Sequence, residues 1–124
     1  DDSARAIYHA FLFVDFYFPF FAGLFLASTA AFSLRYLSPG RYEQLRARNL
    51  FAVFLIPTLF DWGENTFALT VVSAWPESLN WAATGLVLCK QGKLTGVMFL
   101  NGIVGLLLVL ALLKWLGTKA GLLK

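Results

Sequence analysis

Apolar residues in this chain are gathered into runs that are long enough to cross a lipid bilayer. The runs cover residues 7–34, 50–74 and 94–116. A helix that crosses a bilayer needs about 20 predominantly apolar residues, because the hydrocarbon core is about 30 Å thick and contains no water to pair with the backbone. Only 14% of the residues are charged, against roughly 25% in ordinary soluble domains. We therefore expect one all-α integral membrane domain over residues 1–124, a bundle with three transmembrane helices.

The segment between the second and third runs is too short to cross. Residues 81–91 are apolar but are followed by polar residues up to Lys93. A continuous helix over residues 81–116 would be about 54 Å long, well beyond a bilayer core of about 30 Å. We therefore predict a short interfacial helix over residues 81–91 with a break at Gly92. The Ser38-Pro39-Gly40 triplet is a turn signal that should end the first span.

Basic residues lie at particular places along the chain and predict its orientation. Four of them follow the first apolar run and three end the chain: Arg35, Arg41, Arg46, Arg48, Lys114, Lys119 and Lys124. Basic loops face the cytoplasmic side of a membrane. This pattern predicts that the Arg-rich loop and the C-terminus share the cytosolic, stromal or matrix side of a bacterial inner membrane or an organelle membrane. It also argues against a nucleic-acid groove.

The second run carries a polar stripe. Asp61, Glu64 and Asn65 are spaced i, i+3, i+4 and therefore share one face of a helix. Each carboxylate near the centre of a membrane helix costs about 2.5 to 3.5 kcal/mol on insertion scales. An intramembrane acid is therefore a functional-site hypothesis. The alternative is that the stripe only holds helices together through interhelical hydrogen bonds.

Two further charged residues extend this hypothesis. Asp15 lies four residues before Pro19, whose missing N–H leaves the carbonyl of residue 15 unpaired, so a kink is expected there. Lys93 is the one cation expected near the depth of Asp15 and Glu64. We predict a polar intramembrane cluster of Asp15, Lys93 and Glu64, accompanied by Asp61 and Asn65. Alternatively, Lys93 only extends its long side chain to the interface.

His9, near the start of the first span, is a possible cofactor ligand. Its imidazole could bind haem or the magnesium of a chlorophyll, and the many aromatic residues of this span could form a wall for a pigment or quinone. Lipid contact and packing explain the aromatics equally well. The cofactor is therefore unknown, with bound lipid or pigment as options. Cys89 is the single cysteine, and no metal-spaced His/Cys cluster is present, so no metal site is predicted.

Small residues recur along the first and third spans and should allow close helix packing. The packing positions are Gly23, Ala27, Ala31, Gly92, Gly96, Asn101, Gly102 and Gly105. The sequence offers no set of nucleophile, base and orienting residue and no phosphate-binding loop, so we expect no enzyme. These features favour a non-catalytic accessory subunit of a larger respiratory or photosynthetic membrane complex, with lipid and other transmembrane subunits as its partners.

Two other functions remain open. One is a proton- or ion-coupled carrier in which Asp61 and Glu64 form the relay and Lys93 the counter-charge. The other is a membrane module that binds a pigment, haem or quinone.

The polar residues also carry a family resemblance. Asp15, Pro19, Asp61, Glu64, Asn65 and Lys93 form an Asp-x-x-x-Pro first span, an Asp-x-x-Glu-Asn second span and a Lys that opens the last span. In this the chain resembles a group of small uncharacterised bacterial multi-pass membrane proteins from Tyr8 onward. Members of that group carry one more span upstream. The resemblance implies a membrane bundle and no particular activity.

Overall fold

The computed structural model describes residues 2–124, and every regular element in that range is a helix. This confirms the predicted all-α class. The elements are α1 (Asp2–Asp15), α2 (Phe18–Leu37), α3 (Pro39–Ala47), the 3-10 helix η1 (Leu50–Leu55), α4 (Ile56–Ser73) and α5 (Asn80–Lys119).

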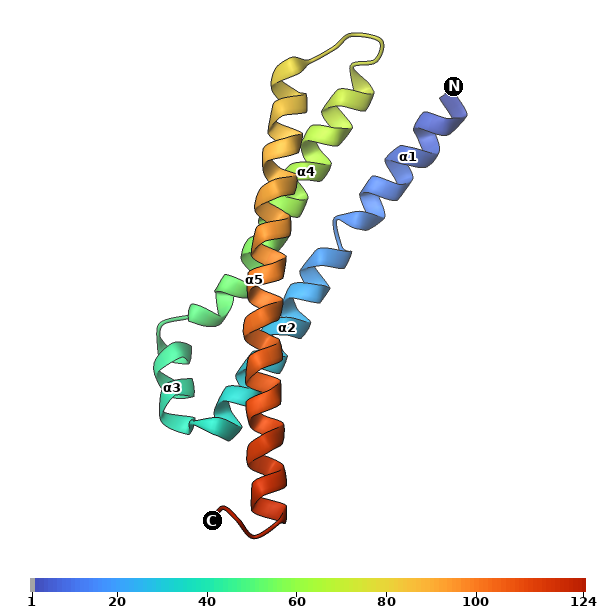
Figure 1. Ribbon diagram of the computed structural model, residues 1–124. Helices are drawn as coiled ribbons and strands as arrows, with labels where there is room; N and C mark the ends of the chain where they lie inside the picture. Colours follow the sequence, from blue (N-terminus) through green and yellow to red (C-terminus); the bar gives the residue numbers. More distant parts are fainter. Residues whose placement is uncertain (1) are drawn as a thin grey trace.

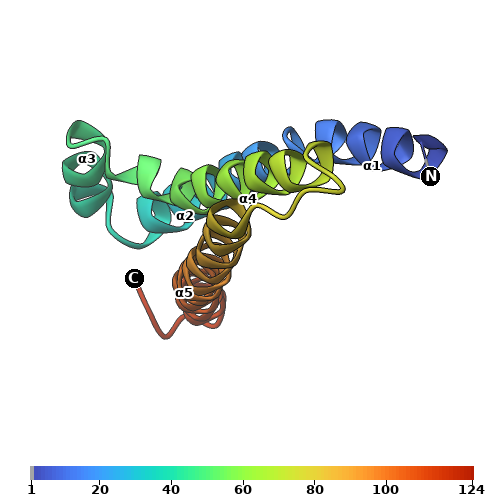
Figure 2. The same ribbon diagram turned by 90° about the horizontal axis from the view of Figure 1, so that it is seen from above.

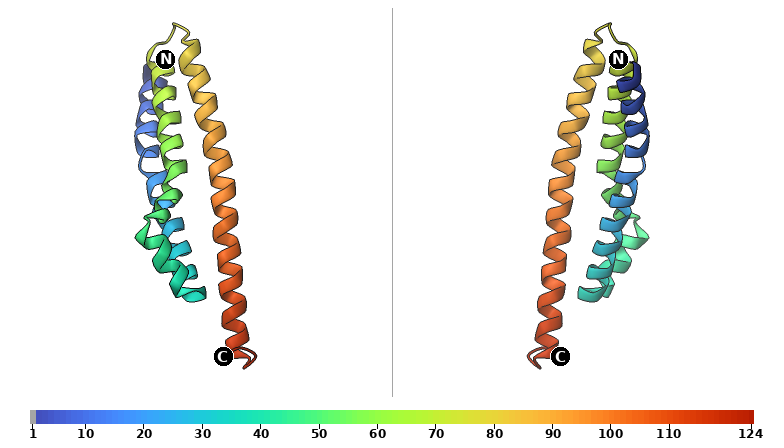
Figure 3. Two further views of the ribbon diagram at one scale, coloured as in Figure 1. Left: turned by 90° about the vertical axis from the view of Figure 1, so that its left-hand side faces the viewer. Right: turned by 90° about the vertical axis from the view of Figure 1, so that its right-hand side faces the viewer.

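The long helix α5 packs against one side of a layer formed by the other long helices. Figures 1 and 2 show α1, α2 and α4 in that layer, with α5 on one face of it. The first half of α5 runs antiparallel to α4, and its second half passes α2, as the side views in Figure 3 also show. The N-terminus and the α4–α5 loop lie at one end of the molecule, while α3 and the C-terminus lie toward the other.

The first apolar run is divided into two helices. α1 ends at Asp15, and α2 begins at Phe18 with Pro19 in its first turn. Proline is well tolerated in a first turn, where its missing N–H would have had no helical partner. The predicted kink is therefore a break between two helices. The indole Nε1 of Trp62 donates a hydrogen bond of 2.6 Å to the Phe16 carbonyl at this break.

The predicted break at Gly92 is wrong. α5 is continuous from Asn80 to Lys119, so residues 81–91 are its first turns and not a separate interfacial helix. Gly92 serves packing: a Cβ atom added there would lie 2.6 Å from the ring of Phe60, and one added at Gly85 would lie 2.6 Å from the ring of Phe67. The glycines make room for rings from α4, which outweighs their weak helix propensity.

Two helical stretches are long and apolar enough to cross a bilayer, Asp2–Leu37 and Asn80–Lys119. α4 has 18 residues and is not one of them. It contains Asp61 and Glu64, and the run that it belongs to begins as the 3-10 helix η1. The predicted second span over residues 50–74 therefore stays a prediction. The predicted end of the first long helical segment at Ser38-Pro39-Gly40 is confirmed, since α2 ends at Leu37 and Ser38 is extended, with φ −153°.

The buried apolar core lies where α2, η1 and α5 meet. Its fully buried members are Ala30, Phe54, Leu100 and Val104. Nearby, Lys114 of α5 donates hydrogen bonds of 2.8 and 3.4 Å to the carbonyl oxygens of Tyr36 and Leu37. These are the last carbonyls of α2, which have no partner within their own helix. Lys114 therefore caps α2 and ties its end to α5.

Gly23 lies at a close contact between α2 and the η1–α4 segment, and it gives a test of the packing. A Cβ atom there would lie 3.0 Å from the Phe54 carbonyl oxygen and 3.1 Å from the Thr58 hydroxyl oxygen. We expect Gly23→Ala to lower the free energy of unfolding by about 1–3 kcal/mol, the usual cost of overpacking. Thermal unfolding in detergent measures this.

Gly102→Ala is the matched control for this prediction. Nothing lies within 4 Å of a Cβ atom added at Gly102, so alanine should leave stability unchanged or raise it by up to about 1 kcal/mol through helix propensity. Equal melting temperatures for the two variants would contradict the close approach at Gly23.

Candidate functional site: a charged cluster beside a cavity

The centre of the molecule holds an ion-paired cluster between α4 and α5. The Nζ atom of Lys93 lies 2.6 Å from Oδ1 of Asp61 and 2.5 Å from Oε2 of Glu64. The side chain of Asp61 is 6% exposed, that of Glu64 20% and that of Lys93 26%. The i, i+3 spacing of the two acids brings both to the face of α4 that meets α5. One lysine therefore bridges two carboxylates from a neighbouring helix.

Asp15 occupies a different place from the one predicted. We expected it to pair with Lys93, but the acids that pair with Lys93 are Asp61 and Glu64. Asp15 is the last residue of α1 and is half-buried. Within residues 2–124 its carboxylate has no ion pair or hydrogen bond. The break after Asp15 separates it from the lysine, although it stays on the wall of the same cavity.

That cavity has a volume of about 550 Å³ and lies between α2, α4 and α5. Asp15, Asp61 and Lys93 are at its charged end. The rest of the wall is mostly apolar and includes Phe18, Phe25, Leu26, Phe54, Pro57 and Val97. Thr58 is on the wall as well; it is 2% exposed and donates a 2.9 Å hydrogen bond to the Pro19 carbonyl. The site therefore joins a charged group to an apolar channel of a size typical of small-molecule sites.

Asn65 and His9 lie apart from the ion pairs. Asn65 is 3% exposed, and its Nδ2 atom is buried without an acceptor among the described residues. His9 lies on α1, half-buried, with its Nε2 atom enclosed and likewise without a partner there. Within residues 2–124 no three His, Cys, Asp or Glu side chains form a group suited to a metal ion. A ligand role for His9 stays a prediction.

The predicted packing residues fall into two groups. Gly23 and Gly92 lie at the close contacts described above, Gly96 lies against Pro57, and Ala27 packs on the core. Ala31 is half-buried.

The remaining three packing residues do not join the helices of this chain. An added Cβ atom at Gly102 or Gly105 would meet nothing within 4 Å. Asn101 donates its hydrogen bond, 2.7 Å long, to Val97 of its own helix and not to a neighbour. Gly102 and Gly105 therefore lie on an open part of α5, whereas Asn101 lies on the wall of the cavity described above.

Several residues that shape the site were missed in the sequence, although Gly92 was predicted as a packing position. Gly85 and Gly92 are seven residues apart, as are Phe60 and Phe67 on α4, and this shared spacing was the available signal for their antiparallel pairing. Gly63 lies against the Cys89 sulfur in the same interface. The hydrogen bond from Trp62 to the helix break had no local signal, because it joins residues far apart in the chain.

Comparisons with protein-family models, curated proteins and solved structures gave no match. The chemistry of the site is therefore inferred from its own residues. Asp61 and Glu64 pair with Lys93, and Asp15 lies unpaired on the wall of the same cavity. In a site with little water, such a group can hold a proton or a further cation.

Removing Lys93 tests whether the cluster is a true charge pair. Lys93→Leu leaves two buried carboxylates without a cation, at a cost of about 3–5 kcal/mol, whereas replacing a whole buried cluster by apolar residues is often neutral. We expect Lys93→Leu to lower the melting temperature in detergent at neutral pH more than the triple change Asp61→Leu, Glu64→Leu, Lys93→Leu does.

Lys90→Leu is the matched control, because Lys90 is exposed and has no ion pair within the described part of the chain. Its melting temperature should stay close to that of the parent. If Lys93→Leu has the same melting temperature as Lys90→Leu, the ion pairs of Lys93 do not stabilise the protein.

Proposed function

We propose that this protein is a non-catalytic subunit of a larger membrane assembly, of respiratory or photosynthetic type, with three membrane crossings. The observation that carries the proposal is the length of apolar helix. The 40 residues of α5 correspond to about 60 Å, about twice the thickness of a bilayer core.

Exposed apolar side chains occur along the whole of α5. Near its start, Trp81, Val87 and Leu88 are 53–64% exposed, and near its end, Leu106 and Leu113 are 61% and 58% exposed. A helix of about 60 Å would need a tilt of about 60° to fit a core of about 30 Å, whereas observed tilts range up to about 40°. Lipid hydrocarbon therefore covers only part of this surface, and other protein subunits would cover the rest.

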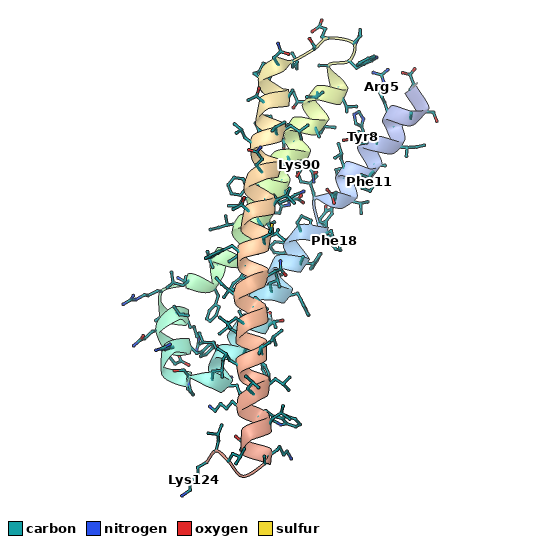
Figure 4. All side chains as sticks on the ribbon, viewed as in Figure 1. Arg5, Tyr8, Phe11, Phe18, Lys90 and Lys124 are labelled. Atoms are coloured by element: carbon teal, nitrogen blue, oxygen red, sulfur yellow. The ribbon has the colours of Figure 1, made fainter. Side chains whose placement is uncertain are left out.

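The first helix supports the same proposal. α1 stands apart from α5 and presents large apolar side chains outward, among them Phe11, and Phe18 at the start of α2 continues this surface; Figure 4 labels both. Phe11 is 64% exposed and Phe18 is 73% exposed. Large exposed apolar patches are typical of interaction surfaces.

Gly102 and Gly105 of α5 offer a contact surface for a partner helix. Gly102 and Gly105 are open, and small residues on a membrane helix let a second helix approach closely. We expect Gly102→Trp and Gly105→Trp to dissociate the assembly on a blue-native gel without lowering the melting temperature of the isolated protein. Leu110→Trp, at an exposed position on another side of α5, is the matched control and should leave the assembly intact. A free protein with no co-purifying subunit after mild extraction would refute the proposed role.

The proposed topology places the α4–α5 loop and the Arg-rich segment on opposite sides of the membrane. These segments lie toward opposite ends of the molecule. In a Cys89→Ser background, we expect Ser78→Cys and Arg46→Cys to react with an impermeant maleimide from opposite faces of sealed vesicles. Reaction of both from the same face would contradict the three crossings.

A further inference from the structure

The cavity beside the charged cluster has the form of a short amphipathic channel. On α5 its wall is the stripe Lys93, Val97 and Asn101, whose members are spaced i, i+4, i+8. This stripe extends about 12 Å at 1.5 Å per residue. Ala22 and Leu26 of α2 lie on the opposite wall, and Leu26 also packs against the apolar core. The channel therefore leads from a charged end at Asp15, Asp61 and Lys93 to an end at the core that is apolar apart from Asn101.

The charged end carries more negative than positive groups. Asp61 and Glu64 share Lys93, at 2.6 and 2.5 Å. Asp15 adds a third carboxylate, and no cation pairs with it among residues 2–124. With all groups ionised the formal charge of the four side chains is −2. A cation placed between Asp15 and Asp61 would offset this excess, and opposite charges attract strongly where water is scarce.

We propose that this channel binds a small hydrophobic ammonium ion, with its ammonium group at Asp15 and Asp61 and its apolar body against Phe18, Phe25 and Val97. The three N–H donors of a primary ammonium group suit carboxylate acceptors. A cavity of about 550 Å³ is the size of sites for drug-sized ligands. A phospholipid headgroup fits less well, because its phosphate would bring a further negative charge to an acidic site. This site requires no partner subunit, although Phe18 belongs both to its wall and to the exposed apolar surface described above.

The proposal is tested by binding to the full chain in phosphatidylcholine nanodiscs. Radiolabelled n-octylammonium is the probe and radiolabelled 1-octanol its uncharged counterpart, each corrected for uptake by empty nanodiscs. We expect saturable binding of n-octylammonium at one site and only unsaturable partitioning of 1-octanol. Absence of saturable ammonium binding, or equal saturable binding of both probes, would overturn the proposal.

Two variants locate the site, and melting temperatures confirm that each is folded. Asp15→Asn is close in shape to the parent and removes the unpaired carboxylate, so it should weaken n-octylammonium binding by roughly tenfold, the effect of one charge-assisted contact. Ala22→Phe fills the channel at a distance from the acids and should abolish saturable binding. Glu77→Gln removes an exposed acid of the α4–α5 loop and should leave binding unchanged. Equal affinity of Asp15→Asn and the parent would overturn the assignment.

The other possible occupants give distinct results. Replacing half of the phosphatidylcholine by phosphatidylethanolamine should leave the n-octylammonium affinity unchanged. Strong competition from that lipid would assign the channel to a lipid headgroup and overturn the proposal. Binding that appears only after a tightly held polypeptide is removed would assign it to a partner helix, with the same consequence. Loss of the assembly on a blue-native gel concerns only the subunit role and does not bear on ligand binding.

Discussion

The rest of the structure depends on the ion pairs that Lys93 makes with Asp61 and Glu64. A charge that is removed from water must be paired, so α4 and α5 can meet only where the lysine faces the two acids. In this antiparallel register the rings of Phe60 and Phe67 lie opposite Gly92 and Gly85. Charge pairing and close packing thus specify the same alignment, and α5 must stay one continuous helix to satisfy both.

The first apolar run is joined to α4 by polar contacts of a different kind. At the break, residues 16 and 17, the Phe16 carbonyl accepts a hydrogen bond from the Trp62 indole. One turn earlier on α4, the Thr58 hydroxyl donates a hydrogen bond to the Pro19 carbonyl. Without such donors an unpaired carbonyl away from water would cost free energy. The break therefore belongs to the packing of α2 on α4, and it sets the position of Asp15 on the cavity wall.

Much of the fold could be predicted from the sequence, because its signals are local. The all-helical class follows from the apolar runs, the end of α2 from Ser38-Pro39-Gly40, and the interruption near Asp15 from Pro19. The prediction of a break at Gly92 was wrong because a helix can be longer than a bilayer is thick. The glycine instead makes room for an aromatic ring from α4. The partners of Lys93 were predicted in part: Glu64 pairs with it, but Asp61 takes the place of Asp15. Which acids pair with Lys93 depends on how far the helix break displaces Asp15, and no local sequence pattern indicates that displacement.

α5 contains four lysines, and two of them, Lys93 and Lys114, were natural markers for the membrane boundaries; the structure gives both a different role. Lys93 is paired with acids of α4, and Lys114 caps the last carbonyls of α2. Because each charge is satisfied within the protein, neither needs headgroups or water at its own level. Lys93 and Lys114 therefore do not determine the depth of α5 in a bilayer, whereas Lys90 is exposed and has no ion pair among the described residues. A further constraint on the depth is that exposed apolar side chains occur near both ends of a helix about 60 Å long, whereas the hydrocarbon core is about 30 Å thick.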